Sequence, residues 1–136
     1  VPELRAYGVN VAFGHDCVMD PWYSMGSGDM LEVASMGLHV AQMTSRDDIR
    51  YCFECVTSHP SKAMGLEGYG LQKGYKADFV LLQARDSIEA IRLKATRLAV
   101  VKSGKVICET APRQAKLALD GRPEMVDPAR YAPREE

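Results

Sequence analysis

The chain has 136 residues, of which 46% are hydrophobic and 26% charged, as in an ordinary globular domain with a core. Its formal net charge of −1 excludes a nucleic-acid surface built on an excess of basic residues. No apolar run approaches the roughly 20 residues that span a bilayer, and Val1–Arg5 lacks the pattern of a secretory signal. We therefore expect a cytoplasmic protein that binds neither nucleic acid nor membrane. The missing initial Met predicts a processed or partial chain.

The first predicted elements are a helix end over residues 2–7, closed by Gly8, and a short buried strand over residues 9–13. A helix that passes into a strand through one glycine is typical of a repeating β/α unit. A long loop is predicted next, over residues 14–28. Loops of this length within a compact domain are usually functional.

Asp16 follows the predicted strand directly, at the end where α/β folds place ligands and catalytic groups. Two interpretations of Asp16 stay open on spacing alone. Its carboxylate could cap the loop by accepting backbone hydrogen bonds. Alternatively, it is a catalytic or metal-associated carboxylate.

Two amphipathic helices are predicted after the loop. Asp29 with Glu32 forms a capping-box pattern at the start of the first, and Ser45 caps the second. Hydrophobic residues at helical spacing give the second helix an apolar face of Ile49, Cys52, Phe53 and Val56. We interpret Met30, Met36 and Met43 as core residues. His39 is interpreted as a histidine without function that is either hydrogen-bonded or half-exposed.

The remaining elements change character along the chain. Pro60 predicts a short helix over Ser61 to Leu66. After Gly68 we predict a strand over residues 79–82, a helix over 86–93, and a hairpin whose strands flank Ser103–Gly104. Residues 111–136 are predicted to be an extended tail.

The cysteines predict reduced thiols rather than a disulfide framework. Cys52-x-x-Cys55 followed by His59 could be half of a zinc site. A structural zinc needs four ligands, and no matching second half follows. We therefore expect helix cysteines, and we keep a small zinc-binding module as a weaker alternative.

The loop sequence resembles a known family. Gly14-His15-Asp16 followed by Asp20-Pro21-Trp22-Tyr23 is similar to the last barrel strand and following loop of bacterial cytosine deaminases in the amidohydrolase superfamily. The resemblance covers roughly residues 1–110. It continues through Met36-Gly37-Leu38-His39-Val40, Gly68-Tyr69-Gly70-Leu71, Ala77-Asp78-Phe79-Val80-Leu81 and Gly104-Lys105-Val106-Ile107.

The resemblance implies an α/β fold: the last β/α unit of a metal-dependent hydrolase TIM barrel plus part of the small β domain beside it. Residues 1–67 would be the C-terminal end of the barrel, residues 68–110 part of the β domain, and residues 111–136 a C-terminal tail. A (β/α)₈ barrel takes about 250 residues, so this chain would contain only part of one.

The resemblance also implies hydrolytic deamination of cytosine or a related amino-heterocycle by metal-activated water, with release of ammonia. It makes Asp16 a weak metal ligand and proton shuttle, with zinc or iron as the divalent metal. It places Trp22 beside the substrate, although anchoring of the loop by burial is the alternative. Cys17 stands where the best-known cytosine deaminases carry a second Asp. It would therefore face the substrate and favour a related heterocycle over cytosine. Cys17 is also a candidate reactive thiol. His15 would not be the main metal ligand and would act through packing or by orienting a metal ligand.

The family's other metal ligands are missing from this chain. The resembled enzymes use a His-x-His pair and further histidines, whereas this chain has only His15, His39 and His59. We therefore expect the isolated chain to be inactive and to bind no metal tightly. The parent protein is expected to be a homo-oligomer. The alternative is a non-catalytic remnant that acts as a structural or self-association module.

Overall fold

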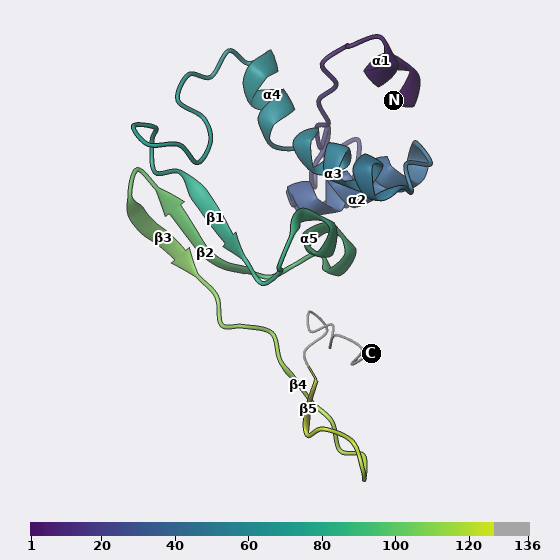
Figure 1. The fold of residues 1–136 in the computed structure, drawn as a ribbon, viewed down its shortest axis with the longest axis vertical. Coiled ribbons are helices and arrows are strands. Elements are labelled where there is room, and N and C mark those ends of the chain that lie inside the picture. Colours follow the sequence, from purple (N-terminus) through teal and green to yellow (C-terminus); the bar gives the residue numbers. More distant parts are fainter. Residues whose placement is uncertain (127–136) are drawn as a thin grey trace, which may run out of the picture.

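A computed structural model describes residues 1–126 as a group of short helices beside a three-stranded sheet (Figure 1). The helices are α1 (Pro2–Ala6), α2 (Met30–Val40), α3 (Arg46–Glu54), α4 (Ser58–Ala63) and α5 (Ser87–Leu93). The strands are β1 (Phe79–Leu82), β2 (Arg97–Lys102), β3 (Lys105–Glu109), β4 (Ala115–Lys116) and β5 (Met125–Val126). Within residues 1–126, every helix is too short or too polar to cross a bilayer.

The N-terminal helix ends as predicted. Gly8 has φ 73°, a left-handed conformation that glycine adopts without a steric penalty. This turn lets the Val9 N–H donate to the Leu4 carbonyl at 3.0 Å, which satisfies one of the last carbonyls of α1. The chain then leaves the helix in an extended conformation.

The predicted strand over residues 9–13 is wrong in this structure. The segment is extended, but no strand pairs with it among the described residues, and Val9 is 46% exposed. A β-strand needs a neighbour to bond its backbone, and hydrophobic sequence alone does not supply one. The Phe13 N–H instead donates to the Cys55 carbonyl at 2.8 Å, at the end of α3.

Helices α2 and α3 begin at the predicted caps. The Asp29 carboxylate accepts a hydrogen bond from the Leu31 N–H at 2.7 Å, and the Ser45 hydroxyl accepts one from the Asp48 N–H at 3.1 Å. The second half of the expected capping box takes another form, because the Glu32 carboxylate accepts a hydrogen bond from the Ser27 hydroxyl at 2.6 Å. Both helix starts are nevertheless fixed by side chains of the predicted residues.

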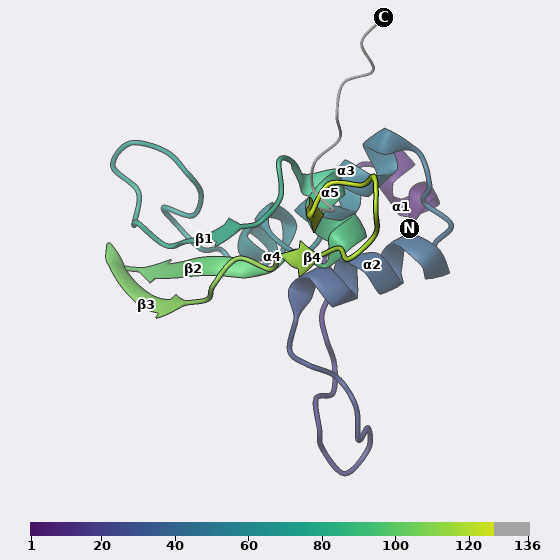
Figure 2. The same cartoon turned by 90° about the horizontal axis from the view of Figure 1, so that it is seen from below.

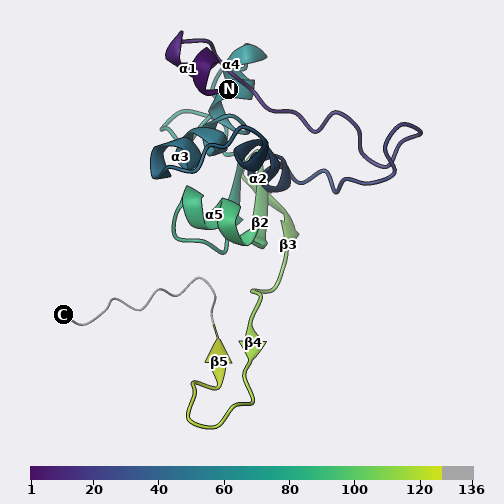
Figure 3. The same cartoon turned by 90° about the vertical axis from the view of Figure 1, so that its right-hand side faces the viewer.

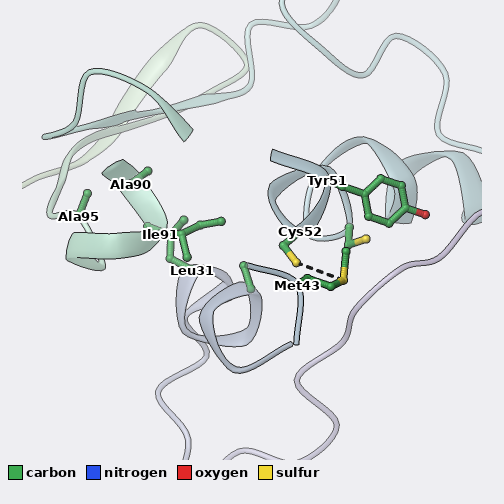
Figure 4. Packing of buried hydrophobic residues seen from close by; sticks show 9 residues of the cluster. Leu31, Met43, Tyr51, Cys52, Ala90, Ile91 and Ala95 are labelled. Atoms are coloured by element: carbon green, nitrogen blue, oxygen red, sulfur yellow. Dashed lines mark hydrogen bonds between the residues drawn. The ribbon is translucent and has the colours of Figure 1, made fainter. Parts of the chain in front are cut away.

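The core lies where α2, α3 and α5 pack against one another (Figure 4). Cys52 and Met43 are completely buried, with their sulfur atoms 3.8 Å apart. Helix α5 closes the other side, where Ile91 lies against Leu31. The buried residues of this cluster are Leu31, Ala34, Met43, Tyr51, Cys52, Cys55, Ala90, Ile91 and Ala95. Burial of these apolar side chains is the main force that holds the three helices together.

The sheet has the order β1-β2-β3, with both neighbouring pairs antiparallel. The predicted strands and hairpin are confirmed, and Ser103 and Gly104 at the turn have φ values of 51° and 74°. Two positive φ values in a two-residue turn suit the right-handed twist of the flanking strands. Strand β3 is exposed along its whole length.

Two further predictions need correction. The short helix predicted over 61–66 begins earlier, since α4 covers Ser58–Ala63 and Pro60 lies inside its first turn, where no intrahelical N–H is needed. The predicted tail contains a small hairpin, in which β4 pairs with β5 and stands away from the helices (Figures 1 and 3). The rest of the predicted tail, residues 127–136, lies outside the described residues.

The three methionines expected in the core differ in how deeply they are buried. Met43 is completely buried, and Met30 is partly buried. Met36 is 61% exposed, so its assignment to the core was wrong. It lies on the face of α2 that is turned toward the loop and not toward α3 and α5. The domain limits at residues 67 and 110 stay predictions.

Candidate functional site

The loop over residues 14–28 extends away from α2 (Figures 2 and 3). Between this loop, the end of the extended segment and α2 lies an open hollow of about 740 Å³. The three residues that the sequence singled out, Asp16, Cys17 and Trp22, all line it. The opposite wall comes from α2 and is mostly apolar, with Val33, Met36, Gly37 and Val40, but it also includes the charged side chain of Glu32.

Asp16 is exposed and has φ 63°. Few residues other than glycine adopt this left-handed conformation, although Asp and Asn tolerate it better than others. Sparsely populated backbone conformations occur often at functional positions, where the surrounding structure holds them. The chain therefore turns at Asp16, at the mouth of the hollow.

Asp20, and not Asp16, is the residue whose carboxylate caps the loop. Its Oδ1 atom accepts hydrogen bonds from the Trp22 N–H at 2.9 Å and the Tyr23 N–H at 3.0 Å. The Asp-Pro pair at 20–21 is a turn signal that could have identified this cap. A hydrogen bond from the Cys17 thiol and these backbone bonds lower the pKa of Asp20.

The Cys17 thiol forms a hydrogen bond with the Asp20 carboxylate. Its hydrogen bond to Asp20, its partial burial and the nearby negative charge of Asp16 raise the pKa of the Cys17 thiol. The thiolate is the nucleophilic form of cysteine, so a raised pKa makes the group less reactive at neutral pH. The geometry therefore disfavours the reactive thiol considered for this position.

His15 packs within the loop. Its Nδ1 atom lies 3.1 Å from the Cys17 carbonyl oxygen. Gly26 lies against the ring, since a Cβ atom there would stand 2.7 Å from His15 Cε1. The Nε2 atom is buried and has no hydrogen-bond partner within residues 1–126. These contacts agree with a packing role for His15.

Trp22 is 89% exposed. The alternative that it anchors the loop by burial therefore does not hold for the part of the chain that the structure describes. An exposed indole at the rim of an apolar hollow offers a flat surface to a ligand.

An ion pair connects the C-terminal end of the loop to the sheet. Arg97, the first residue of β2, pairs with the Asp29 carboxylate through both terminal nitrogens of its guanidinium group, Nη1 and Nη2. The distance from Nη1 to Oδ2 is 2.8 Å. The hydrogen bond from Arg97 lowers the pKa of Asp29 more than any other influence. The sequence did not predict this pair, because the partners are distant in sequence and the capping pattern that identifies Asp29 does not involve Arg97.

The described residues do not form a metal centre. Within residues 1–126, no group of three His, Cys, Asp or Glu side chains is placed to hold a metal ion. This includes Cys52, Cys55 and His59, so the alternative zinc module is not supported. Burial raises the pKa of Cys55 to about 11, which also disfavours the thiolate that zinc requires.

A model of the Amidohydrolase family matches residues 1–109. The chain belongs to the amidohydrolase family. The resemblance that rested on Gly14–Tyr23 is thereby confirmed at the level of the family.

Curated relatives of this amidohydrolase chain match over most of its length. It is 32% identical over 108 residues to N-isopropylammelide isopropyl amidohydrolase of Pseudomonas sp. strain ADP, covering 79% of this chain and 27% of that protein. It is 30% identical over 116 residues to pterin deaminase of Rhizobium rhizogenes, covering 85% of this chain and 26% of that protein. The chain thus spans about a quarter of the length of these relatives.

Solved structures give the same result. The 5-methylcytosine deaminase from Klebsiella pneumoniae, liganded with 5-fluorocytosine, matches with a TM-score of 0.81 and 35% identity, covering 85% of this chain and 28% of that chain. The N-isopropylammelide isopropylaminohydrolase from Burkholderia multivorans matches with a TM-score of 0.74 and 39% identity, covering 77% of this chain and 27% of that chain. The structure is therefore a mixed α/β partial fold of the amidohydrolase family.

Proposed function

We propose that this chain is the C-terminal part of a hydrolytic deaminase that acts on cytosine or a related amino-heterocycle. The relatives support this substrate class, because their names specify 5-methylcytosine, pterin and N-isopropylammelide, all of which are nitrogen heterocycles. The observation that carries the proposal is that Asp16, Cys17 and Trp22 line one hollow beside an apolar helix face.

Asp16 is proposed as the catalytic carboxylate. Hydrolytic deamination requires a water to lose a proton as it attacks the ring carbon that bears the amino group, and the amine must gain a proton to leave. One carboxylate at the mouth of the hollow can accept the first proton and deliver it to the amine. Ammonia and the keto heterocycle are the products.

The family is typically metal-dependent, but the described residues alone do not fit a complete metal centre. Asp16 would contribute one carboxylate to a zinc or iron site, and the remaining ligands would come from outside this chain. We therefore expect the isolated chain to be inactive. Asp16 itself would transfer the proton between the water and the leaving amine.

Trp22 and Cys17 are proposed to contact the substrate. The exposed indole would stack on a flat heterocycle, and the apolar wall of α2 would exclude water from the other side. Cys17 keeps its proton because its pKa is raised, so it would present a neutral thiol to the substrate. A neutral thiol in place of a carboxylate favours a heterocycle other than cytosine itself.

The test is the Asp16→Asn substitution in the full-length protein. Asn tolerates the left-handed backbone at this position, so the fold should be kept while the proton acceptor is lost. We expect kcat to fall by at least about 10²-fold, the usual contribution of general acid–base catalysis. Asp47→Asn is the matched control, because Asp47 is exposed on α3 and pairs only with Arg50 among the contacts described. An Asp16→Asn enzyme with more than half of wild-type activity contradicts the proposal.

A second candidate function is self-association of a non-catalytic chain. It is favoured by the exposed apolar side chains beside the hollow, among them Met36 at 61% and Val40 at 76%. Apolar surface of this kind marks interaction sites. Sedimentation of the purified 136-residue chain tests it: a dimer that Val40→Glu converts to a monomer supports self-association, and a wild-type monomer contradicts it.

A further inference from the structure

The extended segment that leads to Asp16, residues 9–13, is held in place by contacts with the turn between α3 and α4. This turn, residues 55–59, is called the corner. The Asn10 side-chain amide donates to the His59 carbonyl at 3.0 Å. The Nδ1 atom of the His59 ring lies 2.9 Å from the Val11 carbonyl oxygen. The Phe13 N–H donates to the Cys55 carbonyl at 2.8 Å. Three contacts from one corner thus hold a segment that has no paired strand within residues 1–126.

His59 takes part in two of these contacts, and its ring orientation is fixed from several sides. Its Nε2 atom lies 3.6 Å from Oε2 of Glu54. The ring meets Tyr51 edge-on, with ring centroids 4.9 Å apart. Because the Val11 carbonyl can only accept a hydrogen bond, Nδ1 must carry the hydrogen in this arrangement. The Cys55 thiol, 3.7 Å from Nδ1, lies beside this bond at a longer distance.

We propose that His59 is a positioning residue for Asp16. This inference rests on the proposed function, because it assumes that the place of the Asp16 carboxylate matters for turnover. The hydrogen bond from His59 Nδ1 to the Val11 carbonyl sets where the extended segment runs, and the chain turns at Asp16 shortly after it. A catalytic group displaced by about 1 Å loses much of its effect, so a bond remote from the reacting atoms acts on kcat.

A packing role for His59 predicts something different. The Asn side chain places its amide nitrogen near the position of Nδ1, and the Gln side chain places it near the position of Nε2. H59N therefore keeps the bond to Val11, whereas H59Q loses it and keeps more side-chain volume. If His59 only filled space, the longer Gln would substitute better than Asn. If it positions the segment, Asn substitutes better.

The experiment uses the full-length protein with H59N, H59Q and the control H39Q. His39 also bonds a carbonyl through Nδ1, but that carbonyl is Ser35 on its own helix, at 2.6 Å. Amide hydrogen exchange at Phe13 reports how firmly the segment is held, and kcat and KM report its effect on turnover. We expect H59Q to reduce exchange protection and kcat about tenfold each with little change in KM, as for loss of one hydrogen bond that leaves a carbonyl unsatisfied. H59N should restore both, and H39Q should change neither.

Equal exchange protection in H59Q and wild type overturns the positioning role, and so does better rescue by Gln than by Asn. If H59Q does not fold, H59N decides by itself, because its amide nitrogen replaces Nδ1 while the rest of the ring is lost. H59N should keep the Phe13 protection of wild type, and loss of that protection in H59N overturns the inference. A wild-type protein that deaminates no amino-heterocycle contradicts the proposed function instead, while the exchange data still decide whether His59 holds the segment.

Discussion

The ring of Phe13 lies directly on the backbone of Gly37. A Cβ atom at Gly37 would stand 2.4 Å from Phe13 Cε2, closer than any van der Waals contact allows. Gly37 lies inside α2, where glycine costs stability relative to alanine. The absence of a side chain at Gly37 lets the extended segment pack on the helix that forms a wall of the hollow.

The first prediction concerns Gly37→Ala. The better helix propensity of Ala is worth about 1 kcal/mol, whereas overpacking against a rigid ring costs about 1–3 kcal/mol. We expect the clash to dominate and the free energy of unfolding to fall by about 1 kcal/mol, measured by denaturant titration. Gly14→Ala is the control, because a Cβ atom there meets nothing within 4 Å. A stabilised Gly37→Ala protein would show that Phe13 does not occupy this place.

The second prediction concerns pH. The pKa of Asp29 is lowered, chiefly by the hydrogen bond from Arg97, so the folded protein favours the ionised carboxylate. The stability from this pair is present above the unfolded pKa of about 3.9 and is lost as pH falls through the lower folded pKa. Asn still caps α2, so Asp29→Asn should cost only the ion pair, about 1 kcal/mol at pH 7 for a partly exposed site. The difference from wild type should shrink as the pH falls from 7 through the lowered pKa of Asp29, and a difference independent of pH would contradict the assignment.

The third prediction concerns Trp22 in the full-length protein. If the indole stacks on the substrate, Trp22→Ala should raise KM about tenfold, the loss expected for one aromatic contact. Stability should change little, because the side chain is already 89% exposed. Tyr7→Ala is the matched control, since Tyr7 is 86% exposed and lies at the end of α1. Equal kinetics in both variants would contradict a substrate contact by Trp22.

The fourth prediction concerns the reactivity of Cys17. The hydrogen bond to the Asp20 carboxylate is the main cause of the raised pKa of this thiol. Asp20→Asn keeps an oxygen for the backbone bonds of the loop but removes the negative charge, so the thiolate should form at lower pH. Alkylation by iodoacetamide at pH 8, followed by mass spectrometry of the peptides, should be faster at Cys17 in Asp20→Asn than in wild type. The exposed Cys108 gives the internal reference, and an unchanged ratio of the two rates would refute the role of Asp20.

The local elements of this protein could be predicted from its sequence because their causes are local. Asp29 and Ser45 mark helix starts because a side chain near the first turn satisfies free backbone N–H groups. Ser103–Gly104 marks a hairpin because two neighbouring residues accept positive φ. The family could be predicted as well, because Gly14–Tyr23 is a contiguous stretch.

The tertiary structure decided what depends on neighbours distant in sequence. Residues 9–13 have the hydrophobicity of a strand, yet whether they form one depends on which backbone lies beside them, and here the corner at Cys55 and His59 takes that place. Met36 is as hydrophobic as a core residue, but α3 and α5 pack against a different face of α2 and leave Met36 exposed. The Asp29–Arg97 pair joins residues that no local pattern connects. Local propensity is set by a residue and its immediate neighbours, whereas burial and pairing are set by the whole chain. The hollow that Asp16 lines depends on both.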